Sequence, residues 1–544
     1  KVYHPRAAGS LAFTKDIAPI IFQNCAGCHR PGQAAPFPLL NFADVKAKAK
    51  SIAEVTQKRV MPPWKPEPGY GDFLNARLLS VEQLGMLQQW VSEGAVKGNP
   101  NDLPPLPQWT EGWQLGKPDL VVEMLEAFIL PPEGGDVYRN FALPLPLAVA
   151  RYVDAVEFRP GNFKVVHHAA MRLDKTRLSR KRDAREPGPG FGGMTMPETT
   201  YMPNGQFLNW QPGKLPYRAP EVSWLLETNT DLVLQLHLKP DGKPEPVQCS
   251  VGFYFTARAP ERQGFKIVLD NPTIDIPPGE SNYQLEDSYV LPVDADVTAI
   301  FPHAHYLARE MQGFATLPDG TKKWLLLIKN WDFDWQGDYR FAHPVLLPKG
   351  TALHMLFTYD NSTNNVRNPN HPPKRVQFGM ETTDEMGELW IQALPRREDD
   401  LAKLADDYSA KSIAKEVRVQ KLRLEKNPND AKARLQLGKA LLGLQNFAEA
   451  LPQFQLAANL NPTNADAHYF LGLAQRISQN RAAARSEFEK ALQLDPDQYK
   501  AHGNLGVMDL EENNIASARQ HFQDGLRINP DDAFCRENLG RVPK

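Results

Sequence analysis

A 34-residue period near the C-terminus is the feature that most limits what this chain can fold into. Asn-Pro or Asp-Pro dipeptides begin at positions 427, 461, 495 and 529, and Leu-Gly pairs keep the same spacing. The glycines of those pairs are Gly438, Gly472, Gly506 and Gly540. A period of this length is typical of a helix–turn–helix unit that buries its apolar face by stacking on its neighbours. We therefore expect an α-solenoid in which proline ends each preceding helix and glycine allows two helices to approach closely.

This repeat resembles the tetratricopeptide repeat, a helical hairpin with a small residue in its first helix. Three full periods and a partial fourth occupy residues 427–544, which is near the minimum for a stable solenoid. The resemblance implies a concave face on which a protein partner docks, and a purely stabilising appendage is the alternative. The charge-dense residues 396–426 before the repeats are expected to form an exposed helical connector.

A Cys-x-x-Cys-His motif stands near the front of the chain, as Cys25, Cys28 and His29. This is the attachment signature of c-type haem, in which each thiol bonds to a vinyl group and the histidine ligates the iron. A thioredoxin-like disulfide pair would need a surrounding βαβ pattern, which the sequence does not indicate. A zinc site would need two further ligands nearby, and the neighbouring sequence offers only His4. We therefore expect one covalently bound haem c.

A methionine is the expected sixth ligand of that iron, because a thioether raises the reduction potential of an electron carrier. Met61 is favoured, since Pro62 and Pro63 fix the backbone of its loop. Met86 is the competitor, but it falls within an expected helix and is more simply a core residue.

The segment around this motif is predicted to be helical. Apolar residues recur at three- and four-residue spacing over 42–57 and 80–95. Between residues 11 and 97 the chain resembles a small class I cytochrome c. We therefore assign residues 1–97 to a cytochrome c domain and the proline-rich residues 98–117 to a linker.

The residue pattern of the sequence changes after the linker. Short alternating or β-branched runs are separated by Pro, Gly, Asn and Asp, and the 48 prolines of the chain concentrate between residues 98 and 370. This pattern is typical of short antiparallel strands in a β-sandwich or jelly roll. Because the region is long for one sandwich, we expect two in tandem, at residues 118–265 and 266–395.

Five histidines in this β region are the candidate metal ligands: His167, His168, His237, His303 and His305. Residues i and i+2 of a strand face the same side, so His303 and His305 can bind one ion together. The adjacent His167 and His168 face opposite sides unless the strand is bulged or strongly twisted. Scattered structural histidines are the alternative, but these five fall in apolar strands, where an unpaired imidazole is costly. Imidazole suits Zn, Cu, Fe and Ni.

Four pieces in order resemble the copper type II, ascorbate-dependent monooxygenases, the family of the peptidylglycine α-hydroxylating and dopamine β-monooxygenases. The pieces are the His-His pair, Gln-x-His about seventy residues later, His-x-His, and TTDEMGELWIQ about eighty residues beyond. The resemblance implies one copper in each sandwich. The implied ligands are His167, His168 and His237 for the first copper, and His303, His305 and Met386 for the second, catalytic copper. A thioether is a soft donor that suits Cu(I).

The sequence departs from that family at several positions. Ala169 follows the His-His pair where the family has methionine, and Phe301 stands where the peptide-hydroxylating members carry an arginine. Glu388 and Trp390 replace an asparagine and a tyrosine of those members. These departures argue against a glycine-extended peptide as substrate, and the organic substrate is left unidentified.

The two resemblances together predict a copper monooxygenase that hydroxylates a C–H bond with O2. In the resembled family ascorbate supplies electrons one at a time. We expect the fused haem to replace it and to pass electrons, received from an external donor, to the copper of the first three histidines. A haem and copper electron-transfer protein, a scaffold with structural zinc, and an oxidase or reductase of inorganic substrates are the alternatives.

Charge and hydropathy limit the remaining partners. The net charge of the 544 residues is −2, so no strong field would attract nucleic acid. The sequence contains no run of about 18 apolar residues, and we expect no membrane span. Four cysteines are too few for a disulfide scaffold. Because covalent haem attachment takes place outside the bacterial cytoplasm, we expect a periplasmic or secreted protein whose signal peptide has been removed.

Overall fold

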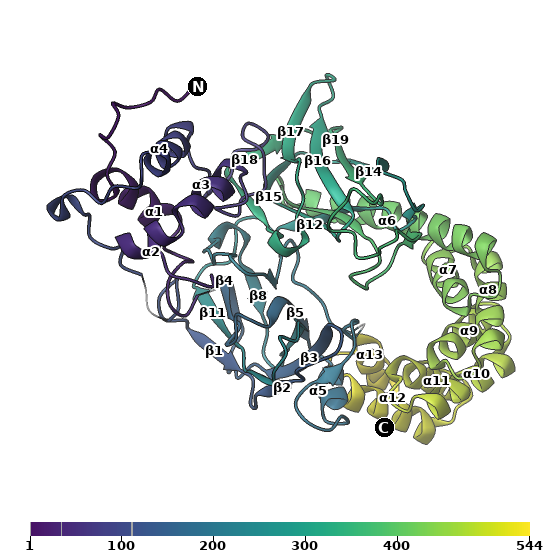
Figure 1. The fold of residues 1–544 in the computed structure, drawn as a ribbon. Coiled ribbons are helices and arrows are strands. Elements are labelled where there is room, and N and C mark those ends of the chain that lie inside the picture. Colours follow the sequence, from purple (N-terminus) through teal and green to yellow (C-terminus); the bar gives the residue numbers. More distant parts are fainter. Residues whose placement is uncertain (1, 34, 110–111, 198, 544) are drawn as a thin grey trace.

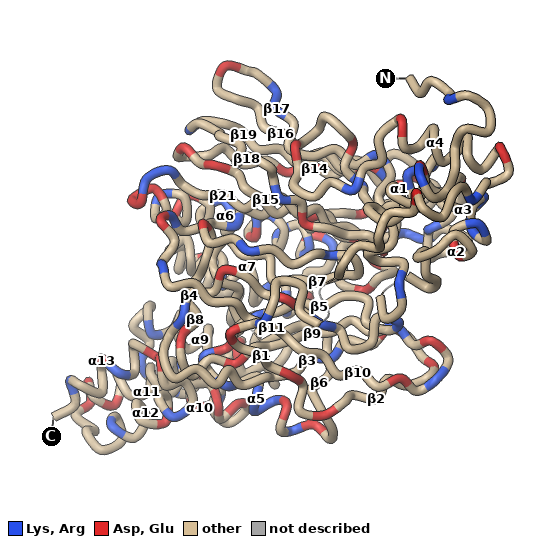
Figure 2. Tube along the Cα trace, turned by 90° about the vertical axis from the view of Figure 1, so that its left-hand side faces the viewer, with Lys and Arg blue, Asp and Glu red and all other residues tan. Residues whose placement is uncertain are grey.

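The computed structural model of the protein describes residues 2–33, 35–109, 112–197 and 199–543. Figure 1 shows a small helical unit, two β-rich units, and a helical solenoid that curves back towards the first β-rich unit. Within the described part of the chain, no helix is both long and apolar enough to cross a bilayer. Lys and Arg are interspersed with Asp and Glu along the trace (Figure 2), in keeping with the small net charge.

The N-terminal unit consists of short helices around one apolar core. Phe13, Ile17 and Trp90 are among the buried side chains of that core. The last long helix begins with a capping box, in which Ser80 and Gln83 each accept a hydrogen bond from the backbone of the other. The helical elements are η1 (Phe13–Ile17), α1 (Ala18–Asn24), α2 (Phe42–Ala47), α3 (Ala49–Gln57), α4 (Val81–Ser92) and η2 (Pro100–Asp102).

The first β unit contains two larger antiparallel sheets that share one apolar core. Their strand orders are β1-β11-β4-β8 and β6-β3-β9-β5-β7, and β10 pairs separately with β2. Val153 from one sheet and Leu234 from the other belong to the same buried cluster. The elements are β1 (Leu120–Glu123), β2 (Phe128–Leu130), β3 (Val137–Pro144), β4 (Arg151–Arg159), β5 (Val166–Asp174), α5 (Leu178–Asp183), β6 (Phe191–Gly192), β7 (Asn209–Trp210), η3 (Pro220–Val222), β8 (Trp224–Leu226), β9 (Asp231–Leu238), β10 (Glu245–Val247) and β11 (Ser250–Thr256).

The second β unit repeats this plan. Sheets of order β12-β21-β15-β18 and β14-β19-β16-β17 contribute to one core, and β13 pairs with β20. That core also includes Phe73 of the N-terminal unit and Leu404, which follows the β strands. The β-rich region predicted from the sequence is therefore confirmed. The elements are β12 (Phe265–Asp270), β13 (Asp275–Ile276), β14 (Tyr283–Val290), β15 (Ala295–Ala304), β16 (Ala308–Thr316), β17 (Lys322–Ile328), η4 (Phe333–Trp335), β18 (Tyr339–Leu347), β19 (Ala352–Tyr359), β20 (Val376–Gln377) and β21 (Gly387–Pro395).

The C-terminal solenoid is built of helix pairs that follow the sequence period. At Gly438 an added Cβ atom would lie 2.5 Å from the ring of Phe454, and matching contacts recur one and two periods later. The predicted close approach of the helices is therefore confirmed for three glycines. It is wrong for Gly540, around whose Cβ position no described atom lies within 4 Å, because no further helix among the described residues packs on α13. The helices are α7 (Ala431–Gly443), α8 (Phe447–Leu460), α9 (Ala465–Ile477), α10 (Arg481–Leu494), α11 (Tyr499–Glu511), α12 (Ile515–Ile528) and α13 (Ala533–Arg541).

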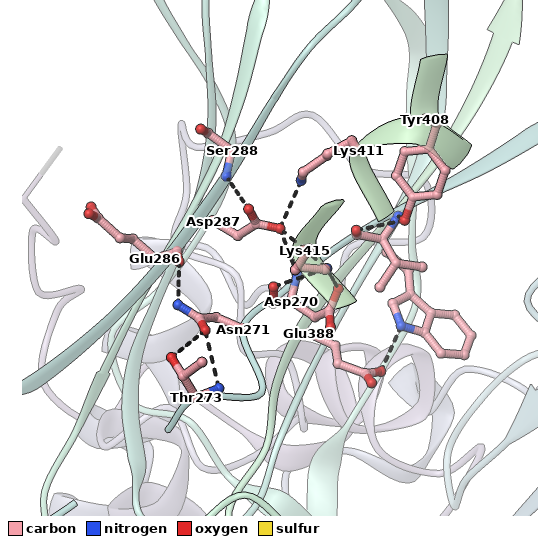
Figure 3. A network of polar contacts seen from close by, with 12 residues as sticks. Asp270, Asn271, Thr273, Glu286, Asp287, Ser288, Glu388, Tyr408, Lys411 and Lys415 are labelled. Carbon is pink, nitrogen blue, oxygen red and sulfur yellow. Dashed lines mark hydrogen bonds and ion pairs between the residues drawn. The ribbon is translucent and has the colours of Figure 1, made fainter. Parts of the chain in front are cut away.

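A long helix, α6 (Asp400–Lys426), connects the second β unit to the solenoid. Figure 3 shows polar contacts through which it docks on that unit. The Tyr408 hydroxyl donates to the carbonyl oxygen of Val268 at 2.8 Å, and Lys411 pairs with Asp287 at 2.9 Å. The connector is thus helical, as expected, but one of its faces is packed on the β unit rather than exposed.

The end of α6 is tied to the same unit by Asp275. This carboxylate accepts hydrogen bonds from Arg375 at 2.6 and 2.8 Å and from Lys426 at 2.7 Å. The hydrogen bonds from these two cations, that of Arg375 first, hold the pKa of Asp275 well below its usual range.

The solenoid also contacts the first β unit. Asp497, just before α11, pairs with Lys181 at 3.3 Å and with Arg185 at 3.0 Å, on and after α5. The helical arc of Figure 1 therefore bridges the second β unit, through α6, and the first.

Candidate functional site

A cluster of three histidines lies where β5 and β9 run side by side. Their register shifts between Val166 and His168, so that His168 is paired with His237 and His167 lies in a β-bulge. The bulge removes the strict alternation of side chains that would point the two adjacent histidines to opposite faces. The bulge that His167 and His168 need in order to bind one ion together is therefore present.

The Nδ1 atoms of these three imidazoles converge on one point. The His167–His168 distance is 3.3 Å, and His237 lies 3.2 Å from each of the other two. Nitrogens bound at about 2.0–2.1 Å to one tetrahedral ion lie about 3.3–3.4 Å apart. Among the described residues, this is the one group of three or more His, Cys, Asp or Glu whose ligand atoms lie within 4.8 Å of one another.

Carboxylates fix the orientation of two of these rings. His167 Nε2 lies 3.1 Å from Asp334 Oδ1, and His237 Nε2 lies 2.6 Å from Asp136 Oδ2. When each Nε2–H donates to its carboxylate, the Nδ1 lone pairs face each other, an arrangement that a shared cation stabilises. Carboxylate partners of this kind orient metal-binding histidines. The donor set fits a metal ion.

Burial favours the neutral, metal-binding form of the imidazoles. Desolvation lowers the pKa of His168 well below its usual value. Desolvation also lowers the pKa of His237, although the hydrogen bond to Asp136 opposes it. The ring of Tyr138 stacks on His237 at 4.4 Å between centroids and 9° between planes, which leaves that imidazole little freedom to turn.

The other histidine pair lies at the end of β15 in the second β unit. The His303 and His305 ring centroids are 5.4 Å apart. His303 Nδ1 lies 2.6 Å from Gln336 Oε1, and His305 Nδ1 lies 3.0 Å from the carbonyl oxygen of Asp384. Donation from both Nδ1–H groups leaves both Nε2 lone pairs for a ligand. Burial lowers the pKa of His305 to about 3.

Met386 precedes the strand that pairs with these histidines. His303 lies opposite Glu388 and Ala304 opposite Gly387, where the pairing of β15 with β21 ends, and His305 and Met386 are the next residues beyond that last pair. Its side chain is buried. Two imidazoles and a thioether are soft, neutral donors that suit Cu(I).

Glu385 is a buried carboxylate beside the predicted ligands that sequence reasoning did not single out. Its buried carboxylate accepts hydrogen bonds from the backbone N–H groups of His305, Leu307 and Met386. Burial raises its pKa to about 8, and those backbone donors oppose the shift. It thereby ties the predicted ligands His305 and Met386 to each other. Its place directly before the predicted methionine ligand was the one available signal.

The two clusters are close to each other. The Phe333 ring centroid lies 5.4 Å from that of His167 and 5.5 Å from that of His305. The centroids of those two imidazoles are therefore at most 10.9 Å apart. Sequence reasoning did not identify Phe333 or the oriented partners Asp136, Asp334 and Gln336.

The four residues predicted to hold haem all line one cavity of about 1210 Å³. Cys25, Cys28, His29 and Met61 lie on its wall, and Met86 lies in the core of the N-terminal unit instead. The cavity continues to the first β unit and reaches Trp335 of η4.

The motif has the free donors that haem attachment requires. Cys25 and Cys28 are free thiols on a tight turn, in which the His29 N–H donates to the Cys25 carbonyl oxygen at 3.0 Å. His29 Nδ1 lies 3.0 Å from the carbonyl oxygen of Phe37, so donation to it leaves Nε2 for a metal ion. These residues fit a covalently attached haem.

Two of the residues that depart from the resembled family, Phe301 and Trp390, form an aromatic pair next to His303. Phe301 and Trp390 have ring centroids 5.3 Å apart, and Trp390 donates to Glu388 at 2.8 Å. Phe301 is buried. A buried phenylalanine therefore stands where the resembled peptide-hydroxylating enzymes carry an arginine, and the Lys266 ammonium lies over the neighbouring Trp390 ring at 4.1 Å.

Comparisons with known proteins bear on the C-terminal part. Family models for the tetratricopeptide repeat match residues 435–498 and 476–534. No curated protein matches the chain. A crystal structure of MamA is 23% identical, with 23% of this chain and 74% of that chain covered and a TM-score of 0.22. A second MamA structure is 22% identical, with 24% and 72% covered and a TM-score of 0.23. The predicted tetratricopeptide repeats at the C-terminus are confirmed.

Proposed function

We propose that this protein is a dicopper monooxygenase that hydroxylates a C–H bond with O2, with electrons delivered through a c-type haem on the same chain. One observation carries the proposal. Three imidazole Nδ1 atoms converge within 3.2–3.3 Å, and the ring of His167 is at most 10.9 Å from that of His305 in a second histidine pair.

Two sets of residues would hold the copper ions. The first set has three imidazoles and the second has two imidazoles and a thioether, which suits a metal that cycles between Cu(II) and Cu(I). Bound copper supplies one-electron transfer and the activation of O2. The first set is His167, His168 and His237, and the second is His303, His305 and Met386.

The surrounding residues keep these donors ready. Asp136 and Asp334 hold two imidazoles of the first set in the tautomer whose Nδ1 is free. Gln336 holds His303 in the opposite tautomer, whose Nε2 is free. Glu385 joins the strand end that carries His305 to the one that carries Met386. Preorganised donors reduce the rearrangement that a redox change at a metal site requires.

Haem would be attached through Cys25 and Cys28, with His29 and Met61 as its axial ligands. The shared cavity supports this assignment, as does the hydrogen bond that leaves Nε2 of His29 free. Bound haem supplies a one-electron relay between an external donor and the copper sites. This proposal assigns residues 1–97 to a cytochrome c domain and residues 118–265 and 266–395 to two copper-binding sandwiches. Because haem is attached covalently outside the bacterial cytoplasm, it also implies a periplasmic or secreted protein.

The substrate would be an organic molecule recognised without a carboxylate clamp. Phe301 and Trp390 present aromatic surface beside His303, where an arginine would be needed for a peptide carboxylate. Charges of both signs lie on this aromatic group, because Glu388 accepts a hydrogen bond from Trp390 at 2.8 Å and the Lys266 ammonium lies 4.1 Å from the centre of the Trp390 ring.

A second candidate function is partner docking without oxygenase chemistry. The tetratricopeptide repeats favour it, because stacked helix pairs present a concave surface for another protein. In that case the haem and copper groups would serve electron transfer to the docked partner.

Metal analysis and oxygen labelling test the proposal. We expect two copper ions and one haem iron per chain, and incorporation of one labelled oxygen atom when organic candidates are incubated with reductant and labelled O2. A His303→Ala variant should retain haem and lose incorporation. Zinc in place of copper would contradict the proposal, and copper without incorporation into any candidate would favour the electron-transfer alternative.

A further inference from the structure

One short segment of the second β unit, residues 332–336, contacts both histidine clusters. Asp334 lies 3.1 Å from Nε2 of His167 in the first cluster. Gln336, two residues later, lies 2.6 Å from Nδ1 of His303 in the second cluster. Both contacts are made to the nitrogen that does not face the metal position, so the segment orients the two rings from behind.

The start of this segment is anchored firmly. Asp332 pairs with Lys65 of the N-terminal unit at 3.2 Å, and these side chains are 13% and 6% exposed. Asp332 also pairs with Arg367 at 3.2 Å and caps η4 by accepting from the backbone N–H of Asp334. These contacts tie the start of the segment to the N-terminal unit through Lys65 and to the loop that carries Arg367.

The middle of the segment fills the space between the clusters. Phe333 is 3% exposed. Its ring is nearly parallel to that of His167, at 29°, and edge-on to that of His305, at 78°. Phe333 therefore contacts one imidazole of each cluster, so that packing as well as hydrogen bonds connects the segment to both.

We propose that residues 332–336 position both histidine clusters together, so that a metal ion bound at the first cluster raises the affinity of the second. The inference rests on the proposed function, since both clusters must bind metal. A cation on Nδ1 of His167 makes its Nε2–H a stronger donor to Asp334, which restricts the turn. Gln336 is then already placed to orient His303, and the second ion meets a more ordered site.

Copper(I) alone, in competition with a chromophoric chelator, is the probe. The second cluster is recognised by copper–sulfur scattering in X-ray absorption, because Met386 is its proposed thioether ligand. We compare its affinity in the wild-type protein with that in His168→Ala, whose first cluster is disabled. The affinity of the second cluster should be about 5- to 150-fold higher when the first cluster is filled.

Two matched variants test whether the segment carries this coupling. Asp334→Ala and Asp136→Ala each remove a carboxylate from the distal nitrogen of a first-cluster histidine, and each should weaken the first cluster about 10- to 100-fold. Asp136 precedes β3 and is not part of the segment. The coupling ratio is the affinity of the second cluster for copper(I) when the first cluster is filled, divided by that affinity when His168→Ala disables the first cluster. At copper(I) concentrations that still fill the first cluster, this ratio should fall to near one in Asp334→Ala and should persist in Asp136→Ala.

Asp334→Ala and Asp136→Ala each remove one carboxylate, and the repulsion between the two bound cations is the same in both. The difference between their coupling ratios therefore measures the contribution of residues 332–336. The Asp334 side chain is 55% exposed, so its removal leaves no buried cavity. Gln336→Ala removes the contact of the same segment with the second cluster and should also abolish the coupling. An unchanged coupling ratio in Asp334→Ala, or an equal loss of coupling in Asp136→Ala, overturns the coupling inference but leaves the proposed dicopper function standing. Failure of either wild-type cluster to bind copper overturns the dicopper function as well, and is recognised by a missing copper equivalent.

Discussion

Replacement of Gly438 by alanine tests the idea that glycine sets the approach of the solenoid helices. The added Cβ would lie 2.5, 2.7 and 2.9 Å from three ring carbons of Phe454, whose side chain is fully buried. Overpacking a core destabilises a protein by about 1–3 kcal/mol. Three close contacts with a buried ring place the destabilisation expected for Gly438→Ala at about 3 kcal/mol. Alanine regains about 1 kcal/mol of helix propensity. We therefore expect a net loss of about 2 kcal/mol.

Hydrogen exchange in the full-length protein measures this loss where it occurs. Peptides from α7 and α8 should exchange about 30-fold faster in Gly438→Ala, because protection follows the local opening free energy. Gly540→Ala is the matched control, since it alters the same Leu-Gly motif where no described atom lies within 4 Å. That control should be neutral or more stable by up to about 1 kcal/mol. Equal exchange in Gly438→Ala and the wild type, or equal losses in both variants, would refute the packing argument.

Three further changes test the proposed haem site, the docking of α6 and the anchor of residues 332–336. Met61→His should lower the haem midpoint potential in a spectroelectrochemical titration, because a thioether ligand raises it, whereas Met86→Leu in the core should leave it unchanged. The basic partners of Asp275 lower its pKa, so its stabilisation is complete above the unfolded value of about 4 and is lost as pH falls through the lower folded value. Asp275→Asn should therefore reduce the acid sensitivity of hydrogen exchange below about pH 4 at the C-terminal end of α6, where Lys426 pairs with Asp275, and an unchanged sensitivity there would contradict this. Lys65→Met leaves Asp332 buried with one cation fewer and should cost about 1–3 kcal/mol in calorimetry, with Lys65→Arg as the control.

The candidate ligands could be found from the sequence because their motifs are local. The Cys-x-x-Cys-His turn, the His-His pair and the His-x-His pair each place their donors within a few residues of one another. The solenoid could be predicted for a related reason, since a fixed period repeats the same packing problem in each helix pair. In both cases spacing along the chain reports directly on spacing in the fold.

The residues that orient these ligands could not be found in this way. Asp136 is 101 residues from His237, and Asp334 is 167 residues from His167. A single Asp or Gln in a loop carries no pattern, and its role depends on how β3 and η4 lie against β5, β9 and β15. The bulge at His167 is similar, because it arises from the pairing of β5 with β9 rather than from the residues of β5 alone.

The two β units are held together by contacts of unequal strength. Where the solenoid meets the first unit, Lys181 and Arg185 pair with Asp497 through side chains that are 36%, 69% and 23% exposed. Pairs of this kind contribute about 0–1 kcal/mol each and weaken with salt. Phe333 is buried, and Asp334 and Gln336 beside it each bond to a histidine of one cluster, although the Asp334 side chain is itself 55% exposed. A partner on the repeats would therefore compete with the weak solenoid contact, while the buried contact of Phe207 in the first β unit with Ala299 and Phe301 in the second keeps the two units together.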